Sequence, residues 1–202
     1  MPDKRTDLLV LQDVRVTEVR FADGARVEMW ISPAASNDGA TTALVDAVAQ
    51  AVAQLPARMR ETLSHIVIHA GEETSFAEDQ GRFFVLYTGT IARRIAAGDL
   101  QETVFHEAVH ATLDVPFASD SAWRAAQAQD GAFITRYAER WPQREDLAES
   151  ALFGWTVLAQ PGRLPADIER QVRLLMPARL KVLEAIYAGD IDIVPPAVRP
   201  EC

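Results

Sequence analysis

Length, composition and charge limit the kinds of protein that this chain can be. Its 202 residues, 49% hydrophobic and 24% charged, are typical of a globular protein with one sizeable core. The net charge of −9 argues against nucleic acid or an anionic membrane surface as the partner, because both would repel the chain. The one cysteine, Cys202, excludes an intramolecular disulfide and a cysteine-rich zinc site.

The amino-terminal stretch MPDKRTDLLVLQDVRV has charges on both sides of a four-residue apolar run. Such a run is too short for the core of a signal peptide. No stretch approaches the roughly 20 apolar residues of a membrane span. We therefore expect no membrane partner, and the lack of a visible leader favours a cytoplasmic location.

The first elements predicted are a hairpin and a helix. Two alternating, β-branched runs around Asp23 and Gly24 predict a β-hairpin within residues 1–32. The stretch SPAASNDGATT reads as a loop. Alanine-rich helical periodicity follows from Thr42 to Leu55, with a break at Pro56 and a further turn or two to Thr62.

The middle of the chain predicts two strands and one helix. The strands are His65–Gly71 and Arg82–Ile91, joined by the acidic loop EETSFAEDQG. Asp99, with Glu102 three residues later, fits a capping box, so a helix is expected to begin at Leu100. Pro116 lies beyond its end.

From Ser121 onward the pattern is almost entirely helical, in five segments separated by prolines. These segments are SAWRAAQAQ, AFITRYAERW, REDLAESALFGWTVLA, ADIERQVRLLM and ARLKVLEAIYA. The order predicts an α+β fold in one domain, residues 1–202. In it a small mixed sheet with the amino-terminal hairpin packs against a mainly helical carboxy-terminal half. Residues 159–190 supply the last helices, and PPAVRPEC reads as a tail.

The stretch from His106 to His110 reads HEAVH and matches the H-E-x-x-H pattern. On a helix, four-residue spacing brings both imidazoles to one face, where they can hold one Zn²⁺. Glu107 lies about 100° around the helix, so its carboxylate can reach a water on the metal without binding the metal itself. The alternative is an ordinary surface helix with two histidines on its polar face.

A catalytic zinc site needs a third protein ligand. A metzincin would have glycine and histidine where this chain has Leu113 and Pro116. Glu145 and Glu149 stand four residues apart on a predicted helix. Glu145 could bind the metal while Glu149 accepts the free N–H of a ligand imidazole. Alternatively, both carboxylates face solvent.

HEAVH followed by RYAERWPQREDLAES resembles the gluzincin-type metallopeptidases related to the anthrax lethal factor catalytic domain and the bacterial Pro-Pro endopeptidases. The resemblance covers roughly Ile66 to Leu158, within the zinc-site core expected over residues 65–158, and implies a zincin-like fold. It implies that His106, His110 and Glu145 bind zinc and that Glu107 is the general base. It also implies that Glu149 supports a ligand histidine without binding the metal itself, and that Tyr137 stabilises the transition state. The family contains many exported proteins.

In the resembled family, an extended substrate peptide lies along an edge strand that precedes the zinc helix. Here that strand would be Arg82 to Thr88, with Arg82, Phe84 and Leu86 binding substrate through backbone and side chains. The alternative is an interior strand, because FFVLY is apolar enough to be one.

Other histidines and the tryptophans are expected to be structural. His65 and His69 share one face of a strand but lie about 13 Å apart, too far to share a metal. Tryptophans among helical apolar positions are expected in the core; these are Trp123, Trp141 and Trp155.

Two functions follow from these patterns. The first is a zinc-dependent endopeptidase that hydrolyses peptide or protein substrates, with Glu107 as general base. The alternative is a zinc-binding or interaction protein that keeps the zincin fold without catalysis. The residues that favour the first are the three predicted ligands together with Glu107 and Glu149.

Overall fold

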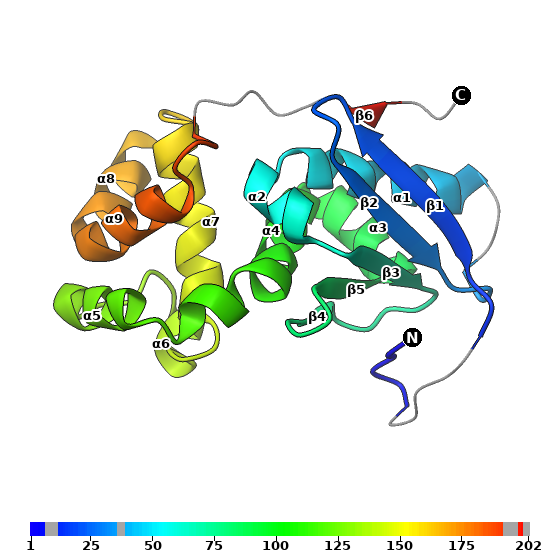
Figure 1. The fold of residues 1–202 in the computed structure, drawn as a ribbon, viewed down its shortest axis with the longest axis horizontal. Coiled ribbons are helices and arrows are strands. Elements are labelled where there is room, and N and C mark those ends of the chain that lie inside the picture. The colour runs from blue at the N-terminus through cyan, green and yellow to red at the C-terminus, as the bar shows by residue number, and fades with distance from the viewer. Residues whose placement is uncertain (7–11, 36–38, 192–197, 200–202) are drawn as a thin grey trace. The chain divides into compact units, whose positions relative to one another are not determined.

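A computed structural model of the chain describes residues 1–6, 12–35, 39–191 and 198–199, the last pair without their side chains. The chain divides into two compact units. The first consists of Met1–Thr112 together with Pro195–Cys202, and the second consists of Leu113–Val194. The predicted α+β class is confirmed (Figure 1). The prediction of one domain over residues 1–202 stays a prediction. No helix of the described chain is long and apolar enough to cross a membrane.

The first unit is built on one mixed sheet. Its described strands lie in the order β4-β5-β3-β2-β1-β6. Neighbouring strands β2, β3 and β5 run parallel, whereas β1, β4 and β6 run antiparallel to their neighbours. The bounds are β1 Arg15–Phe21, β2 Arg26–Ile31, β3 His65–His69, β4 Phe76–Glu78, β5 Phe83–Tyr87 and β6 Val198–Arg199.

The predicted hairpin is confirmed as β1 and β2. Gly24 adopts a φ of 94°, which only glycine takes without strain, and the turn is held by a bond from Ala25 N to Asp23 Oδ1. Along β2, Val27, Met29 and Ile31 are buried, whereas Glu28 is exposed and Trp30 is half-buried. This alternation gives β2 one face toward the core.

Two predictions for the region between β3 and the next helices are wrong. The acidic stretch is not all loop, because Phe76–Glu78 forms β4 and pairs with β5. The strand predicted to reach Ile91 ends at Tyr87, and helix α3 (Thr88–Ala97) follows at once. Gly98, with a φ of 78°, ends that helix in the left-handed conformation.

The predicted tail contains a short strand. Val198–Arg199 pairs with β1 through Phe21 and Arg20. The remaining tail residues, 195–197 and 200–202, lie outside the described residues, as do residues 36–38 of the predicted loop. For the backbone that is described, the tail prediction is therefore wrong.

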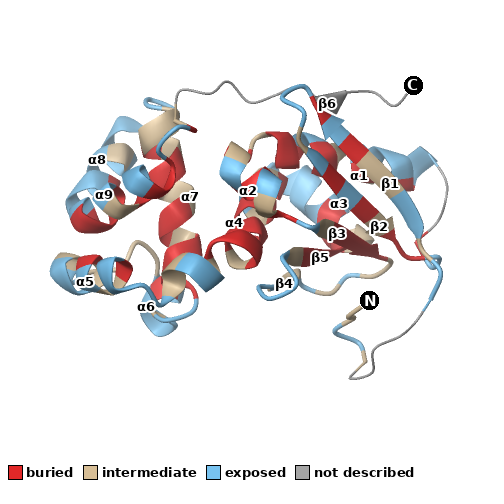
Figure 2. Cartoon of the chain, viewed as in Figure 1, coloured by how far each residue is buried: buried red, intermediate tan, exposed pale blue. Residues whose placement is uncertain are grey.

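Helices α1 (Gly39–Ala53), α2 (Ala57–Thr62) and α4 (Leu100–Thr112) agree with the predicted helices of this unit. Helix α4 begins at Leu100 as expected and packs against α1, β4 and β5. Figure 2 shows buried residues gathered along the central strands and along α4. The helix that carries both motif histidines is therefore anchored to the sheet.

The second unit is helical. Its described elements are a π-helical turn Asp114–Ala118 and the helices α5 Ser121–Asp130, α6 Arg136–Arg140, α7 Asp146–Ala159, α8 Ala166–Leu175 and α9 Pro177–Ile186. Trp123 and Trp155 are buried, as predicted. The core prediction for Trp141 is wrong, because α6 ends after five residues and leaves this side chain 54% exposed.

Arg60 is a buried cation in the first unit, and its replacement tests the fold. Its guanidinium donates to the carbonyls of Ala53 and Leu55 and contacts the carboxylate of Asp23. We expect Arg60→Ala to lower the free energy of unfolding by roughly 2–4 kcal/mol, because these acceptors lose their donor. Arg58→Ala, an exposed change on the same helix, should alter it by less than about 0.5 kcal/mol. Urea denaturation measures the free energy of unfolding of both variants. An equally small change in both would contradict the structural role given to the buried Arg60 guanidinium.

Candidate metal centre

Helix α4 carries His106 and His110 one turn apart. Its apolar side chains, including Val104 and Val109, are buried and fix the rotation of the helix about its axis. Both imidazoles are half-buried, and their planes lie 79° apart. The two Nε2 atoms lie 3.2 Å apart, so each ring presents one nitrogen to the same region.

This separation fits two ligands of one metal ion. Zinc binds imidazole nitrogen at about 2.0–2.1 Å with tetrahedral geometry, so two such nitrogens lie about 3.3 Å apart. The observed distance between the Nε2 atoms is 3.2 Å. The same distance also suits a hydrogen bond from one ring to the other. The spacing therefore supports the ligand pair, and the metal itself stays a prediction.

Glu107 lies in the same turn of α4 as the two histidines. It is 9% exposed, which is unusual for a glutamate on a helix. Glu102, the other glutamate of the same helix, is exposed. The carboxylate of Glu107 is thus largely kept from solvent, and its role as general base stays a prediction.

Glu145 stands at the start of helix α7, where it is the N-cap residue. Its backbone N–H donates to the carbonyl of Trp141 at 2.8 Å, and its own carbonyl accepts from Glu149 N at 3.0 Å. The Glu145 side chain is buried, and its Oε1 lies 3.5 Å from Nε of the exposed Arg144. The helix thus holds Glu145 and Glu149 one turn apart, as the sequence predicts.

Among the described residues, His106, His110 and Glu145 form a group that could hold a metal ion. One ligand atom of each lies within 4.8 Å of the others. The group combines two imidazoles with one carboxylate, a donor set that zinc accepts while keeping a fourth position open. These are the three ligands that the sequence predicts.

Tyr137 lies on α6, whose first turn is capped by the hydroxyl of Thr135 accepting from Ala138 N. Its side chain is 48% exposed. This exposure is compatible with a substrate-contacting phenol, and the catalytic role of Tyr137 stays a prediction.

The prediction that Arg82–Thr88 forms a sheet edge is wrong. Strand β5 lies between β4 and β3, and Phe83 to Val85 pair on both sides. Phe84 and Leu86 are 0% exposed and belong to the core, while Arg82 precedes the strand with a φ of 53°. The alternative, an interior strand, is confirmed, and the edge is formed by β4.

The other two histidines lie elsewhere in the first unit. His65 is stacked between Trp30 and Phe83, with ring centroids 3.9 Å and 4.5 Å away. Burial lowers the pKa of His65 below its usual value. His69 is buried, and its Nε2 lies 3.1 Å from the carbonyl of Pro2. Both side chains make structural contacts with their neighbours.

Comparison with known proteins gives no family for the chain. No protein-family model matches it, and neither a curated protein nor a solved structure matches it. Arguments about function therefore depend on the residues of the chain and their geometry.

Loss of one imidazole tests the ligand group. We expect the parent protein to bind one equivalent of Zn²⁺ and His110→Ala to lose most of it, because the two remaining ligands cannot complete a tetrahedral site. The matched control is His65→Gln, which removes an imidazole outside the group and should keep the metal. Inductively coupled plasma mass spectrometry of the purified proteins measures the metal content. Full zinc retention by His110→Ala would rule out this ligand set.

Proposed function

We propose that the protein is a zinc-dependent endopeptidase with a zincin-like fold. The observation that supports this most directly is the group of His106, His110 and Glu145, with the buried Glu107 on the same helix as both imidazoles. The sequence resemblance to gluzincin-type metallopeptidases points to the same residues. A binding protein would need the ligands but would have no need of a buried carboxylate beside them.

Each residue of the site has one task in this proposal. A zinc ion bound there would polarise the scissile carbonyl and lower the pKa of water to about 7. Glu107 accepts a proton from the attacking water and delivers it to the amine nitrogen as the C–N bond breaks. Tyr137 donates its O–H to the oxygen that becomes negative during the attack. Glu149 accepts an imidazole N–H and so holds a ligand ring in one orientation.

The substrate peptide in this proposal extends along β4. This strand is one of the two edges of the described sheet, the other being β6, and it pairs there only with β5. An exposed edge offers backbone N–H and C=O groups to an extended peptide. Helix α4 packs against β4, so the edge is close to the helix that carries Glu107. In the proposal, β4 therefore takes over the substrate binding that the sequence assigned to Arg82, Phe84 and Leu86.

Removal of the base tests the reaction. Glu107→Gln should keep the metal and abolish turnover of a peptide library, because the amide preserves shape and loses basicity. The control is Glu102→Gln, an exposed change on the same helix, which should cleave at the parent rate. Zinc content is measured alongside the cleavage rate. Zinc without cleavage by the parent itself would favour the binding-protein alternative.

Tyr137→Phe tests oxyanion stabilisation. The lost O–H acts only as charge develops, so kcat should fall by about 10²- to 10³-fold while KM and zinc content stay nearly unchanged. Tyr187→Phe is the matched control, since that buried hydroxyl donates to the carbonyl of Ala151 and should affect stability alone. A kcat within about twofold of the parent would remove Tyr137 from the mechanism.

A further inference from the structure

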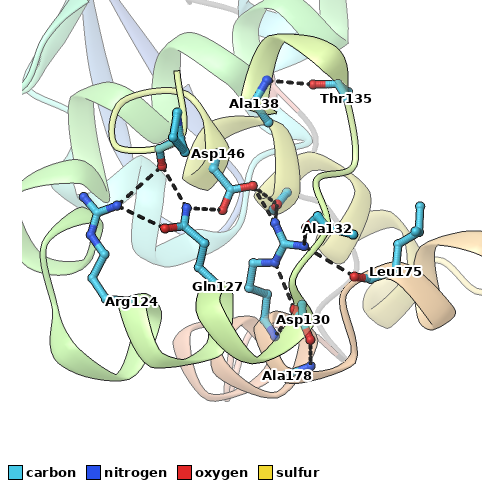
Figure 3. A network of polar contacts seen from close by, with 12 residues as sticks. Arg124, Gln127, Asp130, Ala132, Thr135, Ala138, Asp146, Leu175 and Ala178 are labelled. Atoms are coloured by element: carbon cyan, nitrogen blue, oxygen red, sulfur yellow. Dashed lines mark hydrogen bonds and ion pairs between the residues drawn. The ribbon is translucent and has the colours of Figure 1, made fainter. Parts of the chain in front are cut away.

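A buried ionic network in the second unit joins Asp130 and Asp146, both labelled in Figure 3, through Arg179. The side chains of Arg179, Asp130 and Asp146 are all 0% exposed. The guanidinium donates from Nη1 to Asp146 Oδ1 at 2.5 Å and from Nε to Asp130 Oδ2 at 2.9 Å. Its Nη2 also donates to the carbonyl of Ala132. One cation thus joins two carboxylates away from solvent.

Asp130 links this network to two helices. It is the last residue of α5, and its carboxylate accepts from the backbone N–H groups of Ala178 at 2.8 Å and Arg179 at 3.1 Å. These N–H groups belong to the first turn of α9, where no intrahelical acceptor exists for them. The carboxylate at the end of α5 therefore holds the backbone of Arg179 in position.

Asp146 links the network to the first turn of α7. It directly follows Glu145 in the chain. Besides Arg179, its carboxylate accepts from Gln127 Nε2 at 2.9 Å and from Ser150 Oγ at 3.1 Å. Three donors from three helices converge on this one side chain. They fix the backbone that carries Glu145.

We propose that Arg179 is a positioning residue that holds Glu145 in place for metal binding by fixing Asp146. The inference rests on the proposed metal site. Metal–ligand distances tolerate about 0.2 Å, whereas the ends of helices fray more readily than their interiors. Glu145 is at such an end, and the network removes its freedom to move.

Stability alone does not explain this arrangement. Burying charges carries a desolvation penalty, and replacing a buried ion pair by apolar side chains of similar volume is often neutral or stabilising. Beyond its first turn, α7 also makes apolar contacts, such as Trp155 against Tyr187. What an ion pair adds over apolar contacts is direction, because its hydrogen bonds fix distance and angle.

The test replaces Arg179 and Asp146 together, so that neither partner of this pair is left without the other, while Asp130 keeps the backbone N–H groups of Ala178 and Arg179 as donors. The double variant Arg179→Met/Asp146→Leu keeps apolar volume and removes the directional bonds. We expect a folded protein by circular dichroism whose Zn²⁺ affinity falls about 10- to 100-fold, as for other losses of ligand support. The visible spectrum of bound Co²⁺ should change with the ligand geometry. Amide hydrogen exchange in the first turn of α7 should accelerate.

Arg173→Met is the matched control. Arg173 also contacts α7, but it donates to the carbonyl of Val157 at the other end of that helix. We expect parent-like Zn²⁺ affinity and a parent-like Co²⁺ spectrum for this variant. A loss of affinity equal to that of the double variant would overturn the proposal, because any loosening of α7 would then suffice.

Two results separate the positioning role from the metal site itself. A folded double variant with parent-like Zn²⁺ affinity overturns the positioning role and leaves the metal site standing. Glu145→Gln that binds Zn²⁺ as tightly as the parent overturns Glu145 as a ligand, and the positioning role with it. Weak binding by both the double variant and Glu145→Gln, with the Arg173→Met control unchanged, supports the proposal.

Discussion

The packing of helix α4 against the sheet is the constraint on which the candidate site depends. Buried side chains such as Val104 and Val109 fix the rotation of the helix, and with it the direction in which both imidazoles point. The four-residue spacing within the helix brings the Nε2 atoms of His106 and His110 to 3.2 Å. The same rotation keeps Glu107 from solvent. A helix free to turn would keep the two imidazoles together but would no longer point them in one fixed direction.

The second unit adds a buried polar network to its apolar core. Burial raises the pKa of Asp146, whereas Arg179 and the donors from Gln127 and Ser150 act in the opposite direction. A carboxylate next to a candidate ligand is thus kept in place by several partners at once. The two halves of the proposed site differ accordingly, since apolar packing orients the imidazoles and polar bonds hold the start of α7.

Local signals explain what could be predicted from the sequence. The Asp23–Gly24 turn, the start of α4 at Leu100 and the four-residue spacing of the histidines all act over a few residues, and the structure agrees with them. Strand β4 was not predicted because three residues carry no periodicity and depend on β5 for their pairing. The interior place of β5 is likewise set by distant partners. Arg179 lies 33 residues from Asp146 and 49 from Asp130, so no local sequence pattern could predict the network.

The pair between Arg144 and Glu145 has a consequence for how a metal would arrive. Arg144 is exposed, and its Nε lies 3.5 Å from Oε1 of the buried Glu145. In the proposed site, metal uptake would exchange one cation for another at this carboxylate. Dissolved salt screens exposed charges more than buried ones, so rising ionic strength weakens the competing guanidinium as well as the attraction of the incoming ion. The two effects would oppose each other, so in the proposed site metal capture would be less sensitive to salt than the charge of the group alone implies.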